Sequence, residues 1–236
     1  TKPAEGGSTG SSSTSGGETP AAGGRKLADG NGVDPSGDTI KIGVVGSLTG
    51  DQKAWGEDSV EGAKIAVEEF NAAGGLDGKK VELLVGDSGS KPEQAKTATE
   101  KLISDGAVAL IGEVASGHTI QMAKAAFDKA IPVVAIGATR TDLSQEGGHV
   151  FRVCYTDAFQ GPVMAQFAYQ DLGKRSIAIV TDNKQPYSQG LSQSFKEKFE
   201  ALGGKIVGES KYETGQTDFN GIVTELKAKN PDGLFM

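Results

Sequence analysis

The stretch IKIGVVGSL, residues 40–48, is a short run of β-branched residues interrupted by glycine. A run that is apolar on both faces predicts a strand buried inside a sheet. A helical apolar pattern follows over residues 57–73 and ends at Gly74 and Gly75, and VELLVGD (81–87) predicts the next strand. This order of strand, helix and strand is typical of a parallel sheet, because parallel neighbours need a long crossover connection.

The same alternation continues along the chain. Further strands are expected at 108–113, 131–137, 177–181 and 205–212, and further helices at 92–103, 116–127, 160–172, 191–202 and 218–229. Alternating strands and helices predict an α/β fold of two Rossmann-like three-layer lobes, with helices on both faces of each parallel sheet. The less regular section 138–157 predicts the lobe boundary, so we expect an N-terminal lobe over 38–157 and a second lobe over 158–236. The closing DGLFM indicates a strand with nothing after it to cover it, so we expect this second lobe to be incomplete.

Residues 1–37 differ in composition from the rest of the chain. They consist mainly of Gly, Ser, Thr, Pro and Ala, and almost no residue there could join a core. A segment of this kind cannot offset the entropy lost on ordering, so we expect a disordered leader or tether. No basic region followed by an apolar region, as in a signal peptide, is visible in it.

The composition excludes several classes of function. A formal charge of −7 and a pI near 5.0, with no basic stripe, argue against nucleic-acid binding. Cys154 is the single cysteine, so no internal disulfide is possible, and beside Val153 we expect it in the core. His118 and His149 are the only histidines, and without metal-ligand spacing we expect both in solvated loops. GVVGSLTG (43–50) lacks the glycine spacing of a dinucleotide site, and we expect no cofactor and no metal.

The segment EVASGHT, residues 113–119, places Ser116 and His118 close together where a strand gives way to a helix. Three hypotheses fit it: a catalytic pair, a serine that caps the helix, or an anion site. Catalysis is disfavoured because residues two apart on a helix point to different faces, and the G-x-S-x-G motif is absent. The capping hypothesis stays open.

The anion-site hypothesis draws on the ends of the strands. In open parallel sheets, ligands bind beyond the carboxyl ends of the strands, where free N–H groups at helix starts attract negative charge. The residues at these ends are small or hydroxylated, and those expected to bind a carboxylate are Ser116, Thr119, Gly137, Ala138 and Thr139.

Two aromatic residues occupy equivalent places in the two lobes. Trp55 follows the first strand in the polar segment DQKAWGED, and Tyr187 lies in DNKQPYSQG of the second lobe. Each could simply pack against its own lobe. We expect instead that the two rings hold an apolar part of a ligand between them.

An ordered series of motifs resembles one family. IKIGVVGSLTGDQKAWGEDSVEGAKIAVEEF, LIGEVASGHT, PVVAIGATRTDL and FRVCYTDAFQGPVMAQFAY are together similar to type I periplasmic binding proteins of the leucine/isoleucine/valine-binding class. The likeness runs from residue 39 to residue 236. It implies a two-lobed receptor of an ABC importer, in which positions matching Ser116 and Thr139 bind the ligand's α-carboxylate. The Gly137 carbonyl and the Thr139 hydroxyl would receive the α-ammonium, and Trp55 and Tyr187 match the family's aromatic positions.

This resemblance also sets out what is missing. The family's second-lobe acid and a second aromatic would lie beyond residue 236, and Ser90 and Ala115 stand where some members have a disulfide. The implied function is capture of a branched-chain or similarly apolar amino acid, outside the cytoplasm, by a monomer that delivers it to membrane permease subunits. The leader resembles the stretch behind the lipidated cysteine of lipoproteins. The alternatives are a ligand-sensing domain of a receptor or amide- or urea-responsive regulator and, third, an enzyme.

Overall fold

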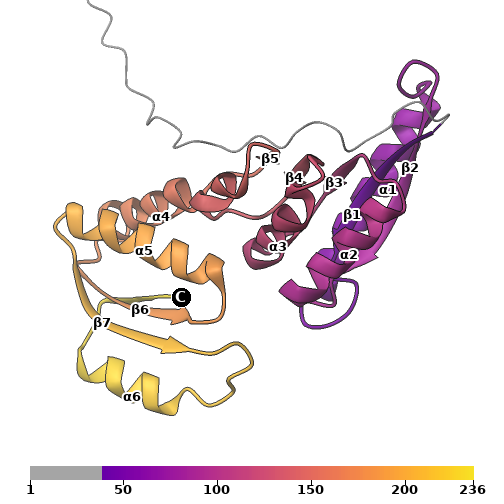
Figure 1. Ribbon diagram of the computed structural model, residues 1–236. Coiled ribbons are helices and arrows are strands. Elements are labelled where there is room, and N and C mark those ends of the chain that lie inside the picture. Colours follow the sequence, from indigo (N-terminus) through magenta and orange to yellow (C-terminus); the bar gives the residue numbers. More distant parts are fainter. Residues whose placement is uncertain (1–38) are drawn as a thin grey trace, which may run out of the picture.

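The computed structural model describes residues 39–236, so the leader predicted for residues 1–37 lies outside the described part of the chain. Residues 39–236 form two parallel sheets, shown on the right and on the left of Figure 1. The first sheet has the strand order β2-β1-β3-β4-β5, and the second has the order β7-β6-β8. Within the described residues, no helix combines the length and the apolar composition needed to cross a bilayer.

The first sheet is built from the first half of the described chain. Its elements are β1 (Thr39–Gly46), α1 (Lys53–Ala72), β2 (Lys80–Asp87), α2 (Pro92–Ser104), β3 (Ala109–Ile111), α3 (Ser116–Phe127), β4 (Val133–Ala135), a short 3₁₀ helix η1 (Thr141–Glu146) and β5 (Val150–Arg152). All neighbouring strands run parallel. Helices α2 and α3 cover a core in which Val45, Leu110 and Met122 are fully buried.

The second sheet has the same kind of construction. Its elements are α4 (Asp157–Gln166), which continues as a π-helical turn η2 (Phe167–Asp171), and then β6 (Ser176–Asp182), α5 (Pro186–Ala201), β7 (Lys205–Tyr212), α6 (Asn220–Ala228) and β8 (Gly233–Phe235). The core is aromatic: the Phe195 ring stacks on Phe235 with ring centroids 3.9 Å apart and on Phe199 at 5.5 Å. The fold is therefore α/β with parallel sheets, as the alternation of elements predicts.

Helix α4 connects the two sheets. It packs on α5 so closely that a Cβ at Gly161 would lie 2.6 Å from the Ser194 Cβ, which only glycine avoids. At its start, the Asp157 N–H donates to the Thr139 carbonyl at 2.8 Å. The segment that leaves the first sheet is thus joined directly to the helix that packs on the second.

The predicted elements are confirmed in kind and in order, but some of their ends are different. Helix α1 begins at Lys53 rather than at residue 57, because the Gly56 N–H already bonds to the Gln52 carbonyl. Trp55 therefore lies on the first helical turn and not in a loop. The prediction of a core position for Cys154 is wrong: the residue is half-buried and follows the edge strand β5, beside Val153, which is 73% exposed.

Candidate functional site

The topology of each sheet brings several loops together at one edge. β1 has β2 on one side and β3 on the other, and β6 lies between β7 and β8. The loops that leave these strands diverge to opposite sides and open a crevice at the carboxyl ends, where α/β sheets bind ligands. Both sheets direct these ends toward the same region, so two crevices face one another.

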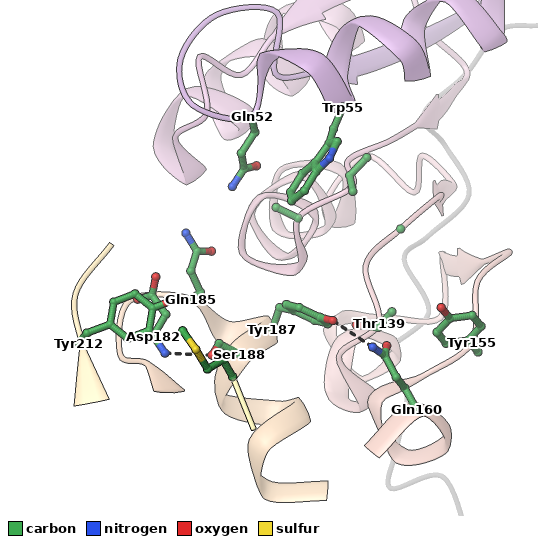
Figure 2. A pocket seen from close by; sticks show the side chains of 14 residues that line it. Gln52, Trp55, Thr139, Tyr155, Gln160, Asp182, Gln185, Tyr187, Ser188 and Tyr212 are labelled. Atoms are coloured by element: carbon green, nitrogen blue, oxygen red, sulfur yellow. Dashed lines mark hydrogen bonds between the residues drawn. The ribbon is translucent and has the colours of Figure 1, made fainter. Parts of the chain in front are cut away.

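A cleft of about 620 Å³ occupies this region. Its volume lies within the usual range for small-molecule sites, about 300–1,000 Å³. The residues that line it are Gln52, Trp55, Val114, Ala115, Gly137, Thr139, Tyr155, Gln160, Asp182, Gln185, Tyr187, Ser188, Tyr212 and Met236. Figure 2 shows Gln52 and Trp55 on one side, with Gln185 and Tyr187 on the other.

Four of the seven residues predicted from the sequence line this cleft: Trp55, Gly137, Thr139 and Tyr187. The other three are not among the lining residues and are almost completely buried: Ser116, Thr119 and Ala138. The Thr119 hydroxyl donates to the Glu113 carbonyl at 3.0 Å, so its contact is with the loop that precedes α3. The structure therefore brings Thr119 close to the site without exposing it to a ligand.

The Ser116 hydroxyl contacts the turn that carries Thr139 through one backbone group, the N–H of Arg140. Ser116 is the first residue of α3, whose N-cap is Ala115, and its hydroxyl makes no bond to its own helix start. The hydroxyl instead accepts from the Arg140 N–H at 3.4 Å, so the capping hypothesis is wrong. Thr139 Oγ1 is buried at the cleft and has no hydrogen-bond partner among the described residues. The Thr139 hydroxyl can therefore turn from the nearby Asp157 carboxylate to a ligand. The Ser116 hydroxyl accepts from Arg140 and keeps its own hydrogen to donate.

The aromatic pair lies on the two opposite sides of the cleft. Trp55 is 58% exposed on the first turn of α1, and Tyr187 lies on the first turn of α5. The Gln160 amide of α4 donates to the Tyr187 hydroxyl at 3.1 Å, which holds the ring in its orientation (Figure 2). An exposed tryptophan opposite a restrained tyrosine suits an apolar group held between two rings.

A buried carboxylate lies beneath the first-lobe wall, and the sequence hypotheses did not include it. Glu113 is 2% exposed, and its Oε1 accepts from the Ser47 hydroxyl at 2.9 Å and the Ser88 hydroxyl at 2.6 Å. Its Oε2 accepts from the Val114 N–H at 3.0 Å. Ser47, Ser88 and Glu113 follow β1, β2 and β3, so the strand order was the signal that could have grouped them.

His118 also belongs to this cluster. It is 3% exposed, and its Nδ1 lies 3.4 Å from Glu113 Oε2, so the prediction of a solvated loop is wrong. His149 does lie in a loop, in the turn before β5, but it is partly buried there, with Nε2 3.0 Å from the Ala123 carbonyl. Burial by itself raises the pKa of Glu113, but His118 and the Ser88 and Ser47 hydroxyls together hold that pKa below its ordinary value. Glu113 is therefore a stabilised anion that holds the loop bearing Val114.

A second buried carboxylate, Asp182, lies in the second lobe. It ends β6, is 5% exposed, and accepts from the Thr214 hydroxyl at 2.6 Å and the Lys184 N–H at 2.9 Å. Its own N–H donates to the Ser188 hydroxyl at 2.9 Å. Asp182 directly follows the strand predicted over 177–181, but the sequence did not indicate that its carboxylate closes the loop that carries Gln185.

Asp157 is buried without comparable partners. It is 1% exposed, and neither of its carboxylate oxygens makes a hydrogen bond among the described residues. Burial raises the pKa of Asp157, and the nearby Thr139 hydroxyl and the charges of Arg140 and Arg152 offset this effect only in part. Because the folded protein then binds this proton more tightly than the unfolded chain, stability falls as the pH rises from the unfolded to the folded pKa.

Replacing Asp157 by Asn should therefore raise the free energy of unfolding at pH 7. The gain should shrink as the pH is lowered through the folded pKa and vanish below the ordinary value of 3.8, where the carboxyl is protonated in both states. Urea denaturation at several pH values measures this difference. Asp182→Asn is the matched control, because its carboxylate has two donors and the substitution should lower stability at pH 7. A loss of stability at pH 7 in Asp157→Asn would contradict the conclusion that the buried Asp157 carboxylate destabilises the folded protein.

Within the described residues, no group of three or more His, Cys, Asp or Glu side chains could hold a metal ion. The cleft offers hydroxyl, amide and aromatic groups instead, on two parallel sheets whose strand ends face each other. This fold and site define an α/β binding protein with a ligand cleft between two lobes.

Comparison with known proteins identifies the family. Residues 39–236 match the family model described as periplasmic binding protein, and the chain belongs to that family. The leucine-specific-binding protein of Salmonella typhimurium is 30% identical over 199 residues, which are 84% of this chain and 54% of that protein.

Solved structures agree with this assignment. A leucine-binding protein from Thermotoga maritima superposes with a TM-score of 0.78 at 35% identity, over 83% of this chain and 55% of that one. A branched-chain amino acid transporter substrate-binding protein from Streptococcus pneumoniae, in complex with isoleucine, gives 0.77 at 31% identity, over 83% and 56%. The chain spans about half the length of these relatives, so the second lobe is partial. These relatives are binding proteins rather than enzymes.

Proposed function

We propose that this protein is an extracytoplasmic solute-binding protein that captures an amino acid for an ABC importer. The observation that carries the proposal is the first-lobe wall of the cleft, where a buried Thr139 hydroxyl without a partner lies beside the start of α3. A helix start and unused hydroxyl donors suit a carboxylate. The kinship with leucine-binding proteins supports the same ligand class.

The proposed ligand is a branched-chain or similarly apolar amino acid. Its α-carboxylate would meet Ser116, Thr139 and the N–H groups at the start of α3, and its side chain would lie between Trp55 and Tyr187. Thr119 and Ala138 would support this wall from behind, since both are fully buried. Contacts from both lobes would stabilise the closed state, because a ligand shifts a two-state equilibrium by its difference in affinity for the two states.

The remaining parts of the proposal concern the whole protein. Its partners would be the membrane permease subunits of the importer, and it would act as a monomer, without catalysis, resident cofactor or metal. Residues 38–157 and 158–236 would be the two lobes that close. A lipid anchor through the leader belongs to the same hypothesis, and that segment lies outside the described residues.

A fluorescence titration tests the proposal. Trp55 is the only tryptophan, so its emission should change when an amino acid such as leucine or isoleucine is added to the intact protein as the cell produces it. Ser116→Ala should weaken this binding by about 1–3 kcal/mol, the cost of a lost hydrogen bond to a charged group. Ser59→Ala is the matched control. Ser59 lies on α1, and its hydroxyl donates to the Trp55 carbonyl of the same helix at the protein surface. Equal affinities for Ser116→Ala and the unaltered protein would remove Ser116 from the site.

A further inference from the structure

An arginine holds the turn that carries Thr139 from outside the cleft, together with the Cys154 thiol, which donates to the Ala138 carbonyl at 3.5 Å. One guanidinium nitrogen of Arg152, Nη1, donates to the Ala138 carbonyl at 3.1 Å and to the Arg140 carbonyl at 2.8 Å. Between these two, the Thr139 carbonyl accepts from the Asp157 N–H at 2.8 Å. Three successive carbonyl groups are therefore bound to donors, and neither Arg152 nor Asp157 lines the cleft.

The geometry of the peptide bond fixes what these bonds do to the opposite side of the turn. In a trans peptide the C=O and the following N–H point in opposite directions. The peptide between Thr139 and Arg140 shows this arrangement: its carbonyl bonds to Asp157, and its N–H bonds to Ser116 Oγ. By the same rule, the bond from Arg152 to the Ala138 carbonyl turns the Thr139 N–H away from Arg152. The Thr139 amide takes part in none of these bonds.

We infer that Arg152 is a positioning residue for carboxylate recognition. It keeps the carbonyl groups of the 138–140 turn away from the cleft and leaves the N–H and hydroxyl of Thr139 as the groups that face the ligand. Without Arg152, two carbonyls lose a charged donor, and the turn can rotate a carbonyl dipole toward the ligand. A carbonyl oxygen there repels a carboxylate. This inference rests on the proposed function, since the carboxylate in question is that of the proposed amino-acid ligand.

The position of Arg152 fits this role. It is the last residue of β5, the strand that pairs with β4, and the turn follows β4 directly. The guanidinium therefore reaches the turn from the neighbouring strand end. A guanidinium has several donors in a fixed plane, so it can hold two carbonyls at once more rigidly than an ammonium group.

The test compares two ligands in the intact protein by calorimetry, L-leucine and L-leucinamide, which lacks the carboxylate. Arg152→Met should raise the Kd for leucine about tenfold or more, the usual effect of misplacing a charge-assisted hydrogen bond. The Kd for leucinamide should stay the same, so the preference for the carboxylate should collapse. Arg152→Lys should restore part of it, and it replaces the Met variant in the comparison if the latter does not fold.

Arg175→Met is the matched control. The Nη1 of Arg175 also donates to two backbone carbonyls, those of Tyr169 at 2.7 Å and Lys174 at 2.9 Å, but it does not line the cleft. This variant should leave both Kd values unchanged. If Arg152→Met raises both Kd values equally, or neither, the inference is overturned. If the unaltered protein binds no amino acid, the proposed function itself fails.

Discussion

Thr139→Val is expected to weaken amino-acid binding by about 10- to 100-fold, because a hydrogen bond to a charged group contributes about 1.5–3 kcal/mol. Thr139 Oγ1 is buried at the cleft and makes no hydrogen bond among the described residues, so a ligand carboxylate would compete only with the nearby Asp157 carboxylate for its donor. Valine keeps the shape of threonine and removes only the hydroxyl. Calorimetric titration of the intact protein with leucine and isoleucine measures the loss.

Two other threonines serve as controls for this substitution. Thr99→Val removes a buried hydroxyl that donates to the Ala95 carbonyl within α2, away from the cleft, and should leave affinity unchanged. Thr119→Val removes the hydroxyl that bonds to the Glu113 loop, and should lower stability more than affinity. An unchanged Kd in Thr139→Val would show that the ligand does not use this hydroxyl.

Glu113→Ala is expected to lower the free energy of unfolding by about 3 kcal/mol or more, since each buried donor that is left without a partner costs about 1–3 kcal/mol. The Ser47 and Ser88 hydroxyls and the Val114 N–H would lose this acceptor. One of the two hydroxyls could still donate to the other, 2.9 Å away, so two donors would be left without a partner. Urea denaturation measures the change. The exposed Glu82 on β2 is the control, since a surface substitution usually changes stability by less than about 0.5 kcal/mol.

The pH dependence gives a second check on Glu113. Because the pKa of Glu113 is lowered in the folded protein, its contribution to stability is complete above about pH 4.5 and is lost as the pH falls through the folded pKa. The stability difference between the unaltered protein and Glu113→Gln should therefore shrink in acid. Two results would show that the Glu113 carboxylate does not stabilise the fold. One is a stability difference that stays constant from pH 7 to pH 3, and the other is a cost for Glu113→Ala no larger than for Glu82→Ala.

The fold could be predicted from the sequence because its signals are local. The β-branched strand around Val44 and the glycines after α1 specify elements within a few residues, and the alternation of elements then specifies parallel sheets. The ends of the elements were harder to place. Helix α1 starts four residues early through backbone bonds that carry no side-chain signal.

For the candidate site, too, only the residues with a local sequence signal could be predicted. Thr139 and Trp55 could be found because each comes after the carboxyl end of a strand, Thr139 in the segment that leads to the next helix and Trp55 on the first turn of the next helix. The roles of Glu113, His118 and Arg152 depend on which strands are neighbours in space, and residue type and spacing do not give that order. His118 illustrates the difference: a lone polar residue in a glycine-containing segment is typical of a solvated loop, yet it lies buried beside Glu113.

Calorimetry of the intact protein with a ligand panel tests the central claim most directly, namely that this cleft binds an amino acid by its carboxylate. The panel consists of leucine, isoleucine, leucinamide, urea and 4-hydroxybenzoate. We predict binding of leucine or isoleucine, with leucinamide about 100-fold weaker, as expected for the loss of two charge-assisted hydrogen bonds. Binding of urea, leucinamide or the aromatic acid, with no binding of either amino acid, would contradict the account.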